Sequence, residues 1–363
     1  MLAGCSSATL GTAPDAPTSP PIPVTGAVIP LGLNNDAKPG YHVTISVGGA
    51  KARPFLLDTG SSGLWVYPNA IGKHRSTTYA VTNSYGSGIV YDGVLAYTQV
   101  DFGNGIVTRD VPVALVTKAT CKSGKVCPAQ PGSSYCPSVK PGPNAGVKCL
   151  ESGRQLYGTF GAALAAIPVP STNPVDELYN VIFAIAQPWA HAFAVTPGAL
   201  VVGEQSLKGY TTMRLTSATV PKPLPNGARA WERDVQLCYT VGTLKHQCFA
   251  SLFDTGASNV SFQADVKLPL VPSANCGDQV KPGTPFAVQT EDGATIASFK
   301  AGSLTNWNRI VAGKTKTTPQ VNTGMTLFNR NTIYYDAKTG IVAIRPLHPP
   351  THTAQSGCGT LSS

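Results

Sequence analysis

The chain has 363 residues, too many for one ordinary hydrophobic core, so we expect two lobes. Charged residues make up only 12% of the chain while 37 Gly and 31 Pro are present, and this turn-rich composition without helical periodicity predicts an all-β fold. The formal charge of +9 comes from scattered Lys and Arg residues, which argues against nucleic-acid binding, and no apolar run reaches the roughly 18 residues that a membrane-spanning helix needs.

The N-terminus carries an export signature. Leu2-Ala3-Gly4-Cys5 resembles the lipobox of bacterial lipoproteins, in which the Cys becomes lipidated. The stretch after it, to residue 26, is rich in Ser, Thr, Pro and Ala, which is typical of an unfolded tether. We therefore expect residues 1–30 to be a lipobox remnant and tether, with Cys5 anchoring the protein extracytoplasmically in a bacterial envelope, in the periplasm or at the outer membrane. The alternative is a merely disordered terminus.

Alternating apolar residues predict the strands that follow. They are expected at 41–47, 55–57, 89–102, 106–116, 181–185, 199–203, 235–239, 249–253 and 332–344. Residues 117–153 carry four Cys and little periodicity, so we expect a disulfide-pinned surface insertion there. The chain then divides into an N-terminal lobe with this insertion, a C-terminal lobe and a tail, at 31–210, 211–350 and 351–363.

The cysteines other than Cys5 number eight, and an even number in an exported chain favours disulfides. No C-x-x-C pair is present, so no metal site is expected. Cys238 and Cys248 flank a predicted hairpin around Gly242, where cross-strand cysteines reach the Cα separation of about 5.5 Å that a disulfide needs. The other pairings, Cys276–Cys358 among them, stay open. The eight expected to be bridged are Cys121, Cys127, Cys136, Cys149, Cys238, Cys248, Cys276 and Cys358.

One internal repeat stands out from this pattern. The segment 55–66, Phe-Leu-Leu-Asp-Thr-Gly-Ser-Ser-Gly-Leu-Trp-Val, is echoed by 251–262, Ser-Leu-Phe-Asp-Thr-Gly-Ala-Ser-Asn-Val-Ser-Phe. Two copies of Asp-Thr-Gly with apolar flanks imply two related lobes, each contributing one loop to a shared site. An ordinary β-turn is the alternative, which explains one copy better than two.

A carboxylate directly after an apolar strand is costly to bury unless it is hydrogen-bonded or shares a proton. The motif glycines, Gly60 and Gly256, let backbone amides approach the carboxylates closely. The motif threonines, Thr59 and Thr255, offer hydroxyls that can bond across the two lobes. Ser61 can donate a hydrogen bond to the first carboxylate from outside the motif.

These features resemble the pepsin-like aspartic proteases over most of residues 41–346, and the lipobox indicates a bacterial member. The family places one Asp-Thr-Gly in each lobe, follows the first with Ser-Ser-x-Leu-Trp, and carries Tyr-Gly-x-Gly in a flap hairpin. The matching positions are Asp58-Thr59-Gly60, Asp254-Thr255-Gly256, Ser61-Ser62-Gly63-Leu64-Trp65 and Tyr85-Gly86-Ser87-Gly88. Gly158-Thr159-Phe160-Gly161 stands where the family threads a Gly-x-x-Gly past the first loop, and Gly324 and Asp336 could fill two second-lobe positions.

The resemblance implies a two-lobed fold with an active site in the cleft between the lobes. Asp58 and Asp254 would share one proton and activate a water that cuts a polypeptide substrate, without a metal, a cofactor or a covalent intermediate. Tyr85, with Gly86 and Ser87 in the flap, would close over the substrate, and Trp65 would pack beneath it and donate a flap contact. Trp65 could also be simply a core residue. The resemblance further implies a monomer that binds pepstatin-type inhibitors.

The chain departs from the family in the second lobe. Asn322-Thr323 precede Gly324 where the family has two apolar residues, so different packing is expected there. Ala257 replaces the hydroxyl residue that many members carry after the second Asp-Thr-Gly. Asp254 would then lack the donor that Ser61 gives Asp58, which would raise the apparent pKa values of the pair, unless a water or backbone amide replaces the hydroxyl.

Three functional hypotheses therefore remain open. The first is an active aspartic endopeptidase. The second is a catalytically weak pepsin-like module of the bacterial envelope that holds peptides or inhibits another enzyme. The third is a structural lipoprotein whose positive surface meets anionic lipid or a cell-wall polymer.

Overall fold

The computed structural model describes residues 26–34, 40–124, 127–131, 139–153, 156–169, 176–220, 222–272, 278–302, 308–313 and 317–347. Cys5, Cys136, Cys276 and Cys358 lie outside these residues, so the expected lipid anchor and three of the expected disulfide cysteines are not described. Among the described residues, no helix is both long and apolar enough to cross a membrane.

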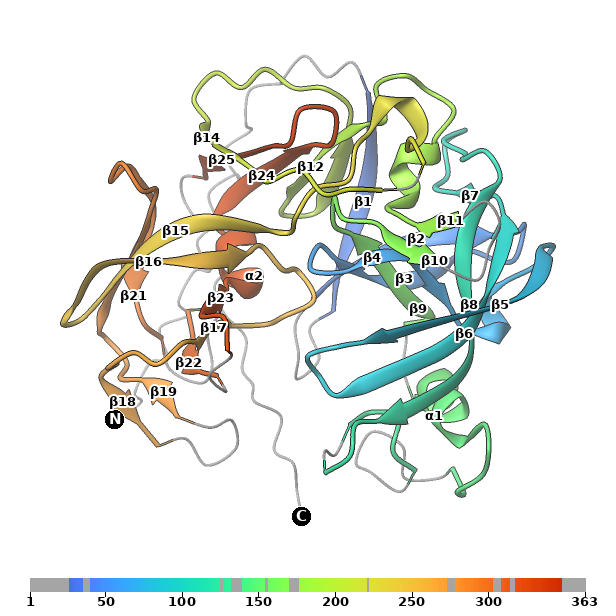
Figure 1. Cartoon of the computed structure of the whole chain (residues 1–363), viewed down its shortest axis with the longest axis horizontal. Coiled ribbons are helices and arrows are strands. Elements are labelled where there is room, and N and C mark those ends of the chain that lie inside the picture. The colour runs from blue at the N-terminus through green and yellow to red at the C-terminus, as the bar shows by residue number, and fades with distance from the viewer. Residues whose placement is uncertain are drawn as a thin grey trace, which may run out of the picture.

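Strands make up most of the described chain, as the composition predicts (Figure 1). The strands before residue 210 are β1 (Ala27–Asn34), β2 (Gly40–Val47), β3 (Arg53–Asp58), β4 (Ser62–Val66), β5 (Arg75–Ser84), β6 (Ile89–Thr98), β7 (Val100–Asp101), β8 (Val111–Cys121), β9 (Gly158–Ala162), β10 (Ile167–Val169), β11 (Asp176–Leu178), β12 (Ala192–Thr196) and β13 (Ala199–Val202). The helical segments there are η1 (Pro68–Ala70), α1 (Ala145–Gly153) and η2 (Val181–Ala184).

The strands after residue 210 are β14 (Thr211–Arg214), β15 (Asp234–Val241), β16 (Leu244–Leu252), β17 (Val260–Gln263), β18 (Leu270–Val271), β19 (Gln279–Val280), β20 (Pro285–Gln289), β21 (Thr295–Lys300), β22 (Ile310–Ala312), β23 (Gln320–Asn322), β24 (Asn331–Asp336) and β25 (Ile341–Pro346). Two short helical segments, η3 (Pro225–Gly227) and α2 (Gly324–Phe328), lie between them.

Two large sheets organise these strands, and one of them joins the two halves of the chain. The order of the larger sheet is β14-β25-β24-β12-β13-β1-β2-β3-β9-β4-β8-β6-β5, with β7 beside β2. Because β24 pairs with β12, strands from the C-terminal half continue the sheet of the N-terminal half. The second large sheet, β18-β19-β22-β17-β23-β16-β15-β20-β21, belongs to the C-terminal half alone and lies opposite β5 and β6 in Figure 1.

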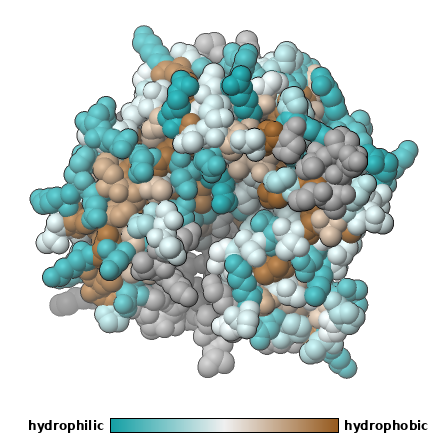
Figure 2. All heavy atoms as spheres, viewed as in Figure 1, coloured by the Kyte–Doolittle hydropathy of each residue, from teal (hydrophilic) through white to brown (hydrophobic). Residues whose placement is uncertain are grey.

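The period-two alternation read from the sequence corresponds to burial on one face of the strands. In β2 the side chains of Tyr41, Val43, Ile45 and Val47 are buried, while Thr44 between them is exposed. Figure 2 shows the outcome on one face of the molecule, where polar side chains cover both lobes and apolar atoms form small, separate patches. Most of the large apolar side chains are thus buried in the core.

One expected strand is wrong. Of the expected strand 181–185, residues 181–184 form the 3-10 helix η2, because the Asn180 side chain accepts a hydrogen bond from the Ile182 N–H at 3.1 Å and caps the turn. All four residues of η2 are buried. A short apolar run is typical of a buried helix as well as of a buried strand, so the pattern alone does not distinguish them.

The Cys-rich segment 117–153 is also more ordered and more buried than expected. Strand β8 runs on to Cys121 and pairs with β6, and residues 145–153 form helix α1. Cys127, Val147 and Leu150 are buried together with Trp65 and Tyr91 in one core cluster. Part of this segment is therefore packed against the N-terminal lobe and does not lie on its surface.

Candidate active site

Each Asp-Thr-Gly loop follows a strand that has another strand beside it in parallel. Asp58 ends β3, and Gly161 on β9 lies opposite it. In the other lobe β16 ends two residues before Asp254, and Asn322 on β23 lies opposite Leu252. The chain then returns on the far side of the parallel strand, as β4 beside β9 and as β17 beside β23. The repeat in the sequence is thus a repeat in topology.

The two threonines tie the loops together across the lobes. The Thr59 N–H donates to Thr255 Oγ1 at 3.0 Å, and the Thr255 N–H donates to Thr59 Oγ1 at 3.0 Å. The hydroxyls then donate onward, from Thr59 to the Phe253 carbonyl at 2.8 Å and from Thr255 to the Leu57 carbonyl at 2.6 Å. Because all four bonds are buried and reciprocal, they fix the position of one loop relative to the other.

The two glycines allow the carboxylates to meet. A Cβ added at Gly60 would lie 2.6 Å from Cγ of Asp254, and one added at Gly256 would lie 2.7 Å from Cγ of Asp58. Any side chain at either position would therefore push the opposite carboxylate away. Each glycine N–H also donates to the Oδ1 of its own aspartate, from Gly60 at 2.9 Å and from Gly256 at 2.7 Å.

The outer oxygen of each carboxylate has a side-chain donor, but the donors differ between the lobes. Ser61 Oγ donates to Asp58 Oδ2 at 2.7 Å. Ala257 occupies the mirror position, since the N–H groups of Ser61 and Ala257 each donate to the carbonyl of their own aspartate at 3.4 Å. The amide of Asn322 donates instead to Asp254 Oδ2 at 2.5 Å. The expectation that Asp254 has no side-chain donor is therefore wrong, because a neighbouring strand supplies one.

Burial and the opposing charge decide where the shared proton lies. Desolvation, and then the negative charge of Asp254, raise the pKa of Asp58 from 3.8 to about 8, against the opposing hydrogen bonds from Ser61 and Gly60. A pair of carboxylates this close holds one proton over a broad pH range. Both causes favour protonation of Asp58 within the pair, an assignment that the sequence leaves open.

The hairpin of β5 and β6 carries the Tyr-Gly-x-Gly turn and extends toward the other lobe in Figure 1. Gly86 and Ser87 are exposed at the turn, which the Gly88 N–H closes by donating to the Tyr85 carbonyl at 3.0 Å. The Tyr85 hydroxyl is buried and makes no hydrogen bond of good geometry to the described residues, although the side chains of Asn83 and Thr159 lie near enough to lower its pKa. Burial and then the nearby Tyr91 and Asp58 groups raise the pKa of Tyr85 well above its usual value, so it stays neutral beside the acidic pair.

Trp65 packs beneath the flap as expected but does not donate the expected hydrogen bond to it. Its indole N–H donates to the Ser62 carbonyl at 3.3 Å. Tyr91, which lies on β6 of the flap hairpin, stands between Trp65 and Tyr85, with its ring 6.0 Å from that of Trp65 and 5.1 Å from that of Tyr85. The Tyr91 hydroxyl meets that of Tyr67 at 2.6 Å. Trp65 thus supports the flap through an aromatic neighbour, and the alternative that it is a core residue accounts for its complete burial.

Sequence reasoning missed three residues around the pair. Tyr91 could have been found, because it shares a strand face with buried Ile89. Asn322 was marked only as a departure from the family pattern. Arg233, whose Nη1 donates to the Gly60 carbonyl at 2.7 Å, gives no signal in the sequence, because the contact joins segments 173 positions apart.

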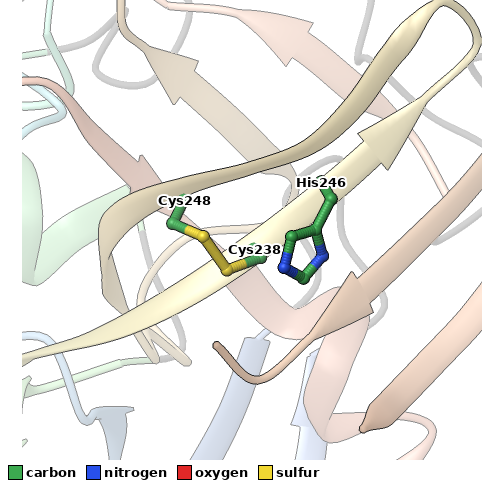
Figure 3. A group of neighbouring side chains, drawn as sticks. All are labelled: Cys238, His246 and Cys248. Atoms are coloured by element: carbon green, nitrogen blue, oxygen red, sulfur yellow. A yellow bond between two sulfur atoms is a disulfide. The ribbon is translucent and has the colours of Figure 1, made fainter. Parts of the chain in front are cut away.

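The described disulfides include the pair predicted from the hairpin. Cys238 and Cys248 are bridged across β15 and β16, Cys121 is bridged to Cys127, and Cys149 is also disulfide-bonded. Figure 3 shows His246 beside the Cys238–Cys248 bridge, a cluster with the residue types of a metal site. Because both sulfurs are joined to each other, neither is a thiolate that could bind a metal. The bridged cluster does not fit a metal site.

Comparisons with known proteins give the context of this geometry. Residues 27–154 match the family model of the PE-PGRS C-terminal aspartyl peptidase-like domain, a range that includes Asp58 and ends before Asp254. PE cleavage protein A of Mycobacterium tuberculosis is 35% identical over 97 residues, and that of Mycobacterium marinum is 36% identical over 97 residues. Each of these matches covers 25% of this chain and 17% of the relative, so the similarity spans a small part of those proteins.

The whole fold is similar to the crystal structure of the aspartic proteinase from Irpex lacteus. The TM-score is 0.61 at 16% sequence identity, over 91% of this chain and 100% of that one. The chain therefore has the pepsin-like aspartic protease fold. The resemblance to pepsin-like aspartic proteases that the two Asp-Thr-Gly motifs indicate is confirmed.

Proposed function

We propose that this chain, with its pepsin-like aspartic protease fold, is an aspartic endopeptidase that hydrolyses peptide bonds with a water activated by Asp58 and Asp254. The observation that carries the proposal is the meeting of two carboxylates in a symmetric cradle, in which Gly60 and Gly256 bring each carboxylate against the other. Asp58 is buried and Asp254 is half-buried, so holding the two carboxylates together is costly, and their hydrogen-bond support is more than a structural turn needs.

The two carboxyl groups have complementary roles in the proposed reaction. Ionised Asp254 takes a proton from the water as the water oxygen attacks the scissile carbonyl carbon, and Asp58 gives its proton to the carbonyl oxygen. A neutral tetrahedral diol results. The C–N bond then breaks as the leaving nitrogen takes the proton from Asp254, while a diol hydroxyl returns a proton to Asp58. Both carboxyl groups end in their starting states.

The flap supplies the enclosure that this chemistry needs. Tyr85 lies close enough to the pair for the Asp58 charge to affect its hydroxyl, so a substrate bound over the pair would lie beside that hydroxyl. An extended polypeptide between the flap and the pair would be shielded from bulk water, which strengthens the electrostatic interactions within the site. The names of the mycobacterial relatives, which state a cleavage, support the same class of substrate.

We further propose an oxidising, extracytoplasmic location for the protein. The disulfides at Cys121–Cys127 and Cys238–Cys248 support it, because such bridges are rare in reducing compartments. The lipid anchor at Cys5 is a prediction from the sequence alone.

The test is proteolysis of a denatured protein across a pH series by wild type, Asp58→Asn and Asp254→Asn. Each aspartate change is expected to abolish cleavage, because the pair acts as a unit, whereas Asp101→Asn on β7 should retain it. Mass spectrometry of the products and inhibition by a pepstatin-type peptide complete the assay. If the wild type binds the inhibitor but cuts nothing, the peptide-binding module is the correct function. Cleavage that survives both single changes would place the chemistry elsewhere.

A further inference from the structure

The hydrogen bond from Asn322 to Asp254 is a feature of the acidic pair that the internal repeat does not explain. Asn322 lies opposite Leu252 on β16 and opposite Ser261 on β17. In the first lobe the corresponding place, opposite Leu56 and Trp65, is held by Thr159. Asn322 is therefore a residue of the parallel strand, outside the loop that carries its aspartate.

Both ends of the Asn322 amide are engaged, which fixes its orientation. Oδ1 accepts the N–H of Gly324 at 2.9 Å, so that Nδ2 is turned toward Asp254 Oδ2 at 2.5 Å. Gly324 has a φ of +55° and a Cβ there would lie 2.4 Å from the Asn259 carbonyl oxygen, so the turn after Asn322 is held in one conformation. An amide N–H can only donate, and a donor favours an ionised carboxylate.

We infer that Asn322 is a positioning residue that holds Asp254 ionised and oriented as the general base, replacing the hydroxyl that Ala257 lacks. This inference rests on the proposed endopeptidase function. Asn322 occupies on Asp254 the place that Ser61 occupies on Asp58, since both donate to Oδ2 while a glycine N–H donates to Oδ1.

The titratable residues around the acidic pair determine whether a pH profile can report on this role of Asn322. Among the described residues, the titratable groups facing the pair are Tyr335 on β24 and Tyr85 in the flap, and burial raises the pKa of both hydroxyls so that they stay neutral. Arg233 lies behind the first loop, where it donates to the Gly60 carbonyl. Among the described residues, the acidic pair is therefore the group whose ionisation the acidic limb of the pH profile is expected to follow.

Asn322→Leu removes the donor and should move the acidic limb of the pH–kcat/KM profile upward by about half a unit to one unit. Adding Ala257→Ser to this variant should restore the limb, because a hydroxyl then stands where Ser61 stands in the other lobe. Gln320→Leu is the matched control. It removes a hydrogen bond to Asp234 from the same strand and should leave the profile unchanged.

The inference is overturned if the Asn322→Leu profile overlays the wild type, if Gln320→Leu moves it equally, or if Ala257→Ser gives no restoration. Should Asn322→Leu fail to fold, Asn322→Asp keeps the shape and the acceptor for Gly324, and should move the limb up at least as far because it sets a third carboxylate beside the pair. An unmoved Asn322→Asp profile would equally refute the role.

A second readout separates this inference from the proposed function. Carboxyl ¹³C NMR of labelled aspartate follows the acidic titration step of the pair without any turnover. If the wild type cuts no substrate, the endopeptidase proposal fails, and the titration step still decides the inference. It should rise in Asn322→Leu and return with Ala257→Ser, and an unchanged step contradicts the role of Asn322.

Discussion

The reciprocal threonine bonds are the contact on which the alignment of the acidic pair depends, and Thr255→Val tests them. Valine keeps the shape of threonine but removes the hydroxyl. The buried Thr59 N–H then loses its acceptor, and the Leu57 carbonyl loses a donor at 2.6 Å. An unsatisfied buried N–H costs about 1–3 kcal/mol and a lost hydrogen bond about 0.5–1.5 kcal/mol, so the free energy of unfolding should fall by about 2–4 kcal/mol.

Loss of this alignment should lower kcat more than it raises KM. A displacement on the order of 1 Å at reacting groups can cost about a hundredfold in rate, so a loss of about tenfold to a hundredfold in kcat is expected. Urea unfolding and steady-state cleavage of a peptide measure the two effects. Thr255→Ser is the control, since it keeps both bonds and loses one methyl group, worth about 0.8 kcal/mol. If Thr255→Val and Thr255→Ser behave alike, the hydroxyl network does not fix the loops.

Two further predictions concern the pH dependence and the flap. The pKa of Asp58 is about 8 in the folded chain, against an ordinary value of 3.8 that applies to the unfolded chain. Between these two pH values the folded chain binds a proton that the unfolded chain releases. The stabilisation from this proton is complete below pH 3.8 and is lost as the pH rises through about 8. The free energy of unfolding of the wild type, measured with urea, should therefore fall between these pH values, and cleavage should decline above pH 8. Asp58→Asn should remove the contribution of Asp58 to the slope of this free energy against pH. An identical slope in the variant would contradict the assignment of the proton to Asp58. Cys121→Ser with Cys127→Ser should lower the free energy of unfolding by about 2 kcal/mol and raise KM, because the backbone N–H of Lys122, beside the bridge, donates to the flap carbonyl of Gly88 at 2.8 Å. The matched Cys238→Ser, Cys248→Ser variant should lower the Tm without changing KM, and equal KM effects in both variants would refute the link to the flap.

Local signals in the sequence predict the parts of the site that a short segment determines. The alternating burial along β2 and the Asp-Thr-Gly loops after apolar strands are of this kind. A few neighbouring residues determine which side chains of a strand are buried and where a glycine lets a carboxylate come close. Asn322 reaches Asp254 across 68 positions, and Tyr91 interposes itself between Trp65 and Tyr85 only once the hairpin is folded. The short apolar run 181–184 is typical of a buried strand, yet it forms a 3-10 helix that the Asn180 side chain caps. In each of these cases tertiary contacts decide what local pattern cannot.

The support of the two aspartates shows how a duplicated site can stay symmetric in chemistry while its sequence diverges. Oδ1 of each carboxylate takes a glycine N–H from its own loop, an interaction that belongs to the backbone and survives substitution elsewhere. Oδ2 depends on a side chain, and here the first lobe uses Ser61 from the loop while the second uses Asn322 from β23. A serine hydroxyl can also accept a hydrogen bond, whereas an amide NH₂ can only donate. Ser61 can therefore adapt to a protonated or an ionised Asp58, while Asn322 favours only the ionised partner. This difference matches the proposed roles, since Asp58 holds the proton and Asp254 must receive one.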